Sequence, residues 1–241
     1  MFNLNSFAKL GFFIYIIIYL ISPKLAITQN TIVDIRKNLE IALNARNFEL
    51  IKNNFKDEES LKIQSKFSEI IKDFPNSKWQ IKRSNIGNSK EKIFIIKVNG
   101  EKIINGQIYF LESNFNYLYT TFNGKINRGN IKNLFTTIRN DQNKIDIIFS
   151  IPEKVLTGTN YDIDIILSKP LGDVIVAGGI ISHQNDSYLK QEINLEPLVS
   201  GGIFKTTRAS SKPSTQIWSG VIAHPKGIIS FTKSVEIVEK I

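Results

Sequence analysis

Apolar residues recur every three or four positions between Thr31 and Pro75. This spacing predicts two or three amphipathic helices over residues 30–74, because side chains three and four apart share one face of a helix. Asn30 or Thr31 is a suitable cap for the first helix, and Pro75 ends the last. The predicted apolar faces comprise Ile32, Ile35, Leu39 and Leu43, then Phe48, Ile51 and Phe55, then Ile63, Phe67, Ile70, Ile71 and Phe74.

After Pro75 the apolar period changes to two, which is typical of strands that are buried on one face. The pairs Asn99-Gly100 and Asn123-Gly124 predict two hairpin turns, and residues 113–116 predict a further turn. Residues 126–143 are polar, and we expect a connection there with a short helix around Leu134. Helices followed by an antiparallel meander predict a basic α+β domain over residues 29–140, which resembles cystatin-like and NTF2-like folds in element order.

From residue 141 onward the chain carries short β runs at nearly regular spacing, separated by turn residues. Seven strands in about 100 residues predict an immunoglobulin-like β-sandwich over residues 141–241. The Cys…Trp…Cys pattern of antibody domains is absent, because the chain has no Cys. The predicted strands are 145–149, 161–167, 174–182, 188–195, 203–208, 217–223 and 228–238.

The first 28 residues have the order of an export signal. Lys9 precedes the apolar run Leu10–Ile21, which ends at Ser22-Pro23. Twelve residues rising 1.5 Å each are too short to cross about 30 Å of hydrocarbon. We expect cleavage after Ala26 or Thr28, or else an uncleaved anchor, which would then be the only contact with a membrane. The predicted location is the periplasm or the thylakoid lumen.

The formal net charge is +9, and all of the positive excess lies before residue 141. Residues 29–140 hold 19 basic and 11 acidic residues, whereas residues 141–241 hold 10 and 11. Any anionic partner should therefore meet the first of these stretches. Only six of the 31 basic residues are Arg, which weighs against nucleic acid as a partner.

Few residues offer catalytic or metal-binding chemistry. The two histidines, His183 and His224, have neither H-x-H nor H-E-x-x-H spacing. Asp162 and Asp164 lie two apart on a predicted strand, where a solvated face, a calcium-binding edge or an acid pair would give the same pattern. We therefore predict no catalytic residue, no cofactor-binding residue and no metal ligand.

Two glycine pairs, Gly178-Gly179 and Gly201-Gly202, lack the spacing of phosphate-binding loops and are interpreted as bulges or tight turns. Ser200, Ser210 and Ser211 lie outside any G-x-S-x-G motif, so they are interpreted as turn residues.

Basic and aromatic residues alternate in the predicted meander. They would form a platform for single-stranded nucleic acid or glycan if they shared one face. Opposite faces of alternating strands produce the same pattern without a ligand. The residues concerned are Lys92, Lys97, Lys102, Tyr109, Phe115, Tyr117, Tyr119 and Lys125.

The least common combinations of residues lie near the C-terminal end: Leu195-Glu196-Pro197-Leu198, residues 201–206, Trp218, residues 222–227 and Thr232-Lys233, together with Pro170-Leu171-Gly172 and Ala177-Gly178-Gly179. Over residues 145–238 the chain resembles a group of uncharacterised exported proteins of marine cyanobacteria. The resemblance implies a Sec-type signal and no catalytic residue. Trp218 is predicted to be a core residue, with an anchor for a partner as the alternative.

Three functions remain open from the sequence. The first is a non-enzymatic exported protein that binds an unknown protein or component of the envelope or lumen. The second is a pocket for a small ligand or substrate between the helices and the meander of the first domain. The third is electrostatic adhesion to an anionic surface through residues 29–140.

Overall fold

The computed structural model describes residues 31–84, 91–140, 145–169, 174–184, 192–199 and 201–240. The predicted export signal therefore lies outside the described residues. The chain divides into two units, Met1–Ile35 and Arg36–Ile241.

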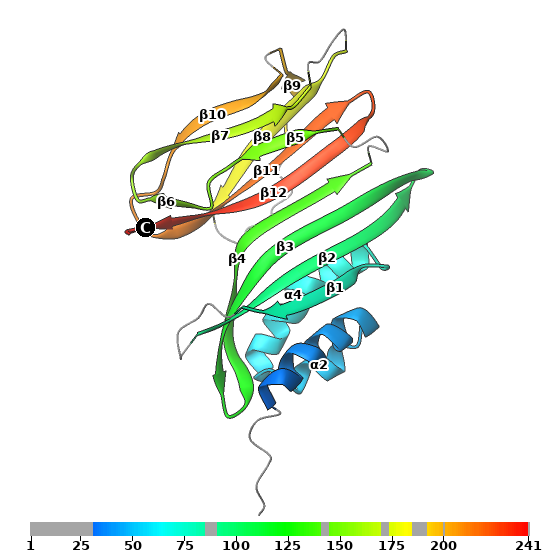
Figure 1. Ribbon diagram of the computed structural model, residues 1–241, viewed down its shortest axis with the longest axis vertical. Helices are drawn as coiled ribbons and strands as arrows, with labels where there is room; N and C mark the ends of the chain where they lie inside the picture. Colours follow the sequence, from blue (N-terminus) through cyan, green and yellow to red (C-terminus); the bar gives the residue numbers. More distant parts are fainter. Residues whose placement is uncertain are drawn as a thin grey trace, which may run out of the picture. The chain divides into compact units, whose positions relative to one another are not determined.

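Within the described residues, three helices precede the strands, where the helical spacing predicts two or three (Figure 1). They are α2 (Thr31–Ala45), α3 (Phe48–Lys52) and α4 (Asp57–Asp73). The first turn of α4 is acidic, which complements the positive end of the helix dipole. The Phe74 N–H still bonds the Ile70 carbonyl, and Pro75 follows directly. No helix among these described residues is long and apolar enough to cross a membrane.

The remainder of the described chain is largely antiparallel β structure in two sheets (Figure 1). The larger sheet has nine strands in the order β1-β2-β3-β4-β12-β11-β8-β9, with β6 paired to β12 in parallel, and the smaller has the order β10-β7-β5. The strands are β1 (Lys78–Arg83), β2 (Lys92–Ile104), β3 (Gln107–Phe122), β4 (Lys125–Arg139), β5 (Ile147–Ser150), β6 (Lys154–Leu156), β7 (Asn160–Leu167), β8 (Ala177–Gln184), β9 (Glu196–Pro197), β10 (Gly202–Arg208), β11 (Ser214–His224) and β12 (Gly227–Val238).

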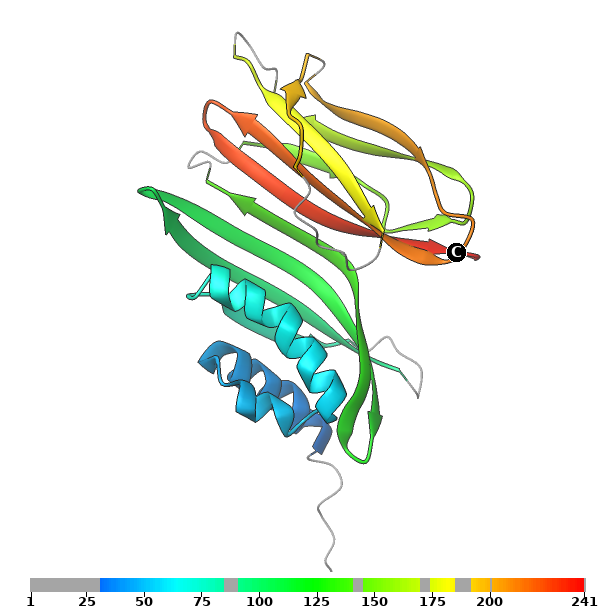
Figure 2. The same cartoon turned by 180° about the vertical axis from the view of Figure 1, so that it is seen from behind.

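The two halves of the larger sheet are covered on opposite faces (Figures 1 and 2). On the helical side, Ser113 bonds Thr136, and Thr136 pairs with Thr232 of β12. Because alternate residues of a strand point to opposite faces, Phe231 points to the face opposite that of Thr232 and the helices. Phe231 is buried with residues of the smaller sheet. Helices therefore cover β1 to β4, and the smaller sheet covers the reverse face of β12, β11 and β8.

The described residues show no clear split into two domains at the predicted position near Asn140. Strand β4 pairs with β12 from Phe135↔Lys233 to Arg139↔Ile229, so one sheet continues across that position. The Lys132 and Glu236 side chains lie 3.3 Å apart across the same pair of strands. Two sheets do enclose a shared core here, but an immunoglobulin-like topology is not established.

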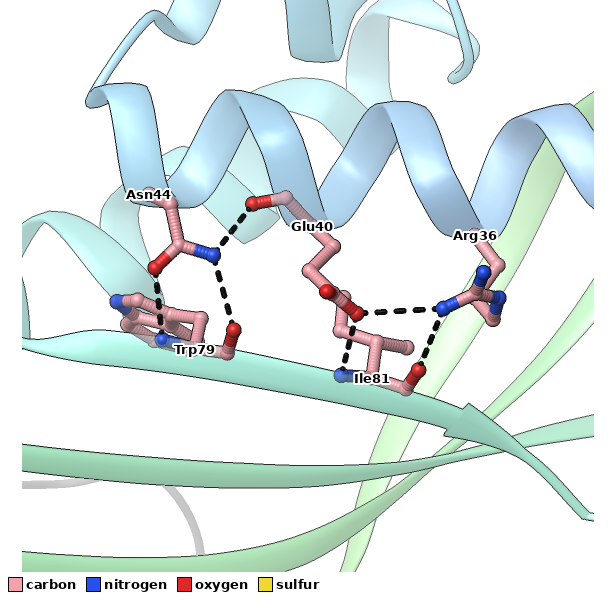
Figure 3. A network of polar contacts seen from close by, with 5 residues as sticks. All are labelled: Arg36, Glu40, Asn44, Trp79 and Ile81. Carbon is pink, nitrogen blue, oxygen red and sulfur yellow. Dashed lines mark hydrogen bonds and ion pairs between the residues drawn. The ribbon is translucent and has the colours of Figure 1, made fainter.

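The outer edge of β1 is occupied by side chains of α2 (Figure 3). Asn44 accepts a bond from the Trp79 N–H and donates to the Trp79 carbonyl, both at 2.9 Å. Glu40 accepts from the Ile81 N–H, and Arg36 donates to the Ile81 carbonyl, again both at 2.9 Å. The helix thus satisfies backbone groups that an added strand would otherwise pair with.

Several predicted turns are wrong. Asn99-Gly100 lies inside β2, and the first hairpin turn is at Asn105-Gly106, where φ is 50° and 77°. A Cβ at Gly100 would lie 3.1 Å from the Phe74 Cβ, so close packing accounts for this glycine. The second predicted hairpin, at Asn123-Gly124, is confirmed by the pairing of Phe122 with Lys125.

Two further expectations before residue 140 are also wrong. Residues 113–116 lie within β3 rather than in a turn. Residues 126–139 are strand rather than a polar connection with a short helix at Leu134. In the predicted strand 188–195, residues 188–191 lie outside the described residues, and 192–195 have no regular structure.

Candidate functional site

A groove lies between α4 and the sheet, with a volume of about 250 Å³. Its walls come from α4, β3 and β4, and one residue of β12 completes them. Most of its surface is apolar, and charged side chains occur along α4 only. The lining residues are Lys66, Phe67, Glu69, Ile70, Asp73, Phe74, Leu111, Phe115, Ile131, Leu134, Thr136, Ile138 and Thr232.

The spacing of apolar residues on α4 determines which side of the helix faces this groove. Ile63, Phe67, Ile71 and Phe74 form the buried face against the sheet. The Phe67 ring packs edge-on against Trp79, with ring centroids 5.0 Å apart. This packing fixes the rotation of the helix, so that Ile70 lies half-buried at the border of the groove.

The groove is open because helical cover ends above β4 while the sheet continues. Thr136 of β4 pairs with Thr232 of β12, and both line the groove. Ile131, Leu134 and Ile138 on β4 are only half-buried. Apolar side chains in this state gain free energy when a ligand or partner removes them from water.

The hydroxyl groups on the floor of the groove are already paired. The Ser113 and Thr136 hydroxyls lie 2.6 Å apart, and the Ser219 and Thr232 hydroxyls 3.2 Å apart. The floor therefore offers no nucleophile with an adjacent base, and its chemistry is that of apolar contact. At the rim, Asp73 lies 4.0 Å from the ammonium of Lys102.

A buried acid lies in the first turn of the same helix. The Tyr117 hydroxyl donates to Glu59 at 2.7 Å, and both side chains are buried. Burial, and then the bond to this carboxylate, raises the pKa of Tyr117 above its ordinary value. The pair ties α4 to β3 and lies outside the residues that line the groove.

The basic and aromatic residues of the meander do not form a platform, which was one of two alternatives from the sequence. Phe115, Tyr117 and Tyr119 are buried. Lys97 is exposed between Ile96 and Val98, whose side chains are both buried, so it points to the opposite face of the sheet. Lys92 and Lys102 do share a face with aromatic residues, since they pair with Tyr119 and Tyr109, so burial of the rings is what removes the platform.

The two histidines lie apart. His183 pairs with Ile217 in the β8–β11 ladder, whereas His224 is the last residue of β11. Seven residues of strand, or roughly 24 Å, separate these positions. His224 Nδ1 accepts the Lys226 N–H at 3.0 Å, as expected in a turn. Within the ranges that the structure describes, no group of three metal-ligating side chains occurs.

The remaining candidate residues occupy ordinary positions in strands and turns. Asp162 is exposed and accepts a bond of 2.7 Å from the Thr206 hydroxyl, while Ile163 beside it is buried. The interpretation of Gly178-Gly179 as a bulge or tight turn is wrong, because both glycines lie in the regular β8–β11 ladder. An added Cβ at Gly178 would lie 3.0 Å from Leu198. Gly201 has a φ of 75°, as a tight turn requires.

Trp218 is a core residue, as predicted, with 1% of its surface exposed. Its indole N–H donates to the Tyr161 hydroxyl at 3.0 Å, and that hydroxyl donates to Gln216 at 2.7 Å. The chain of bonds satisfies all three polar groups inside the core, so Trp218 is not available as an anchor for a partner.

Comparison with known proteins gives a match for the C-terminal part of the chain only. Residues 142–238 match a family described as a domain of unknown function (DUF8623). This match lies within the predicted C-terminal stretch. It leaves out the helices and every groove residue except Thr232. No curated protein matches the chain.

Proposed function

We propose that this is a non-enzymatic exported protein that acts by binding, and that the groove beside α4 is its binding site. The half-buried apolar floor formed by β4 carries this proposal, because filling the groove would remove that floor from water. Export rests on the apolar run Leu10–Ile21, and the periplasm or thylakoid lumen is the proposed location.

We further propose a fold for each part of the chain. Helices against an antiparallel meander support a cystatin-like or NTF2-like arrangement for residues 29–140. Two sheets around the core of Trp218 support an immunoglobulin-like sandwich for residues 141–241. The binding groove would then belong to the first part and extend to β12 of the second.

An unknown protein or component of the envelope or lumen is the first candidate occupant of the groove, and a small apolar ligand is the second. The groove volume of about 250 Å³ favours it, since this is close to the lower end of the range of about 300–1,000 Å³ for ligand pockets. A single ring or a short acyl segment has a suitable size.

A neutral naphthylamine dye that fluoresces in apolar surroundings tests the groove directly. We expect the protein to bind the dye, and Ile70→Phe, which adds bulk at the border of the groove, to weaken binding about tenfold. Ile41→Phe is the matched control, because Ile41 lies on α2, is 48% exposed and does not line the groove.

Thermal unfolding of both variants checks that they are folded. Absence of dye binding to the wild-type protein, or equal weakening by the two substitutions, would contradict the proposed site.

A further inference from the structure

We infer that the occupant of the groove is an amphipathic helix of a partner polypeptide with basic residues beside its apolar face. This inference rests on the proposed function, because it names the partner of the same site. It follows from the shape of the groove, the residues along α4 and the charges at the rim.

The side chains of α4 that line the groove recur every three or four residues and so lie along one side of the helix. Lys66, Glu69, Ile70 and Asp73 all line the groove, at positions i, i+3, i+4 and i+7. Side chains at this spacing follow one line along a helix and are those that a second helix lying alongside would contact. The stripe spans about two turns, or roughly 10 Å.

The floor of the groove matches this length. Leu134, Thr136 and Ile138 alternate along one face of β4 and span roughly 14 Å. Beside them, Thr232 of β12 belongs to the same sheet face. An added helix would therefore lie next to α4 on this face, with its apolar side chains on β4.

The charges at the rim of the groove determine which side chains are favoured beside the apolar face of that helix. Glu69 is exposed, and the Asp73 side chain is 66% exposed with Lys102 at 4.0 Å. Both acids lie in the last two turns of α4, where the helix dipole is also negative. Lys66 lies one turn earlier. Basic side chains of the partner are therefore favoured beside Glu69 and Asp73.

Two synthetic 18-residue amphipathic helices, identical in their Leu face and flanked by either Lys or Glu, test this inference. Binding of labelled peptide to the full chain is followed by fluorescence anisotropy in 0.1 M salt. We expect the Lys-flanked peptide to displace the dye and to bind about fivefold more tightly than its Glu-flanked counterpart, as two exposed ion pairs would produce.

Charge reversal at the groove provides the decisive variant. Glu69→Lys with Asp73→Lys should reverse the preference. Glu101→Lys with Glu112→Lys changes the net charge equally at exposed positions outside the groove and should leave the preference in place.

Equal binding of the two peptides, or equal effects of the two double variants, would overturn the inference. Dye binding that neither peptide displaces would overturn it as well, while the proposed function would stand with a small apolar ligand.

Discussion

Replacing Asn44 by Ala removes both hydrogen bonds between this side chain and the Trp79 backbone, each 2.9 Å long. Each bond contributes about 1 kcal/mol to the free energy of unfolding. Ala is better than Asn in a helix by about 0.6 kcal/mol. The expected net loss is therefore about 1.5 kcal/mol, or a fall in Tm of about 3–6 °C for a chain of this size.

Asn38→Ala is the matched control, since Asn38 lies on the same helix and the structure gives its described side chain no hydrogen bond. Both variants gain the same helix propensity, so their difference reports the bonds of the Asn44 side chain, which are the two to Trp79 and an exposed one to the Glu40 carbonyl. Urea unfolding followed by far-UV circular dichroism measures that difference. A difference below about 0.5 kcal/mol would refute the view that α2 stabilises this strand edge through side-chain bonds.

Three further substitutions test the buried contacts. Tyr117→Phe should cost about 1.5–3 kcal/mol near neutral pH, because it leaves the buried Glu59 carboxylate without its donor. The folded-state pKa of Tyr117 is raised, so the wild-type protein should lose stability as the pH rises above the unfolded-state pKa of about 10. Between pH 9 and pH 11 the variant should lose less stability than the wild-type protein, as measured by urea unfolding. Equal losses would contradict this. Gly129→Ala should destabilise by about 1–3 kcal/mol, because its Cβ would overlap the Tyr117 hydroxyl, and an unchanged urea midpoint would contradict that packing. Tyr161→Phe should lower the thermal midpoint, because the Trp218 indole then loses its acceptor; an unchanged midpoint would show that the buried bonds contribute nothing.

Helices and most strands could be predicted because their apolar periods reflect one-sided burial. Tight turns were harder to predict. Asn99-Gly100 and Asn105-Gly106 are the same dipeptide, yet only the second is a turn. Gly100 meets a packing requirement at Phe74, which the local sequence does not reveal.

Strand β4 shows why the floor of the candidate site could not be predicted. Its sequence contains many polar residues, and it forms a strand because β3 and β12 pair with it on both sides. Tertiary pairing here overrides weak β propensity. The alternation of Leu134, Thr136 and Ile138 was the available signal for the groove floor. A pocket between helices and meander could be expected, but not its extension to Thr232 of β12.

The pairing of β4 with β12 also sets an order of events during biosynthesis. Arg139 and Gly227 are the ends of these strands, and 88 residues separate their positions. At about 5–20 residues per second, a ribosome needs roughly 4–18 s to pass from one to the other. For that interval the β4 edge has no native neighbour, and an unpaired edge can join a second nascent chain. Assistance from a chaperone would matter most in these seconds, before the completing strand emerges.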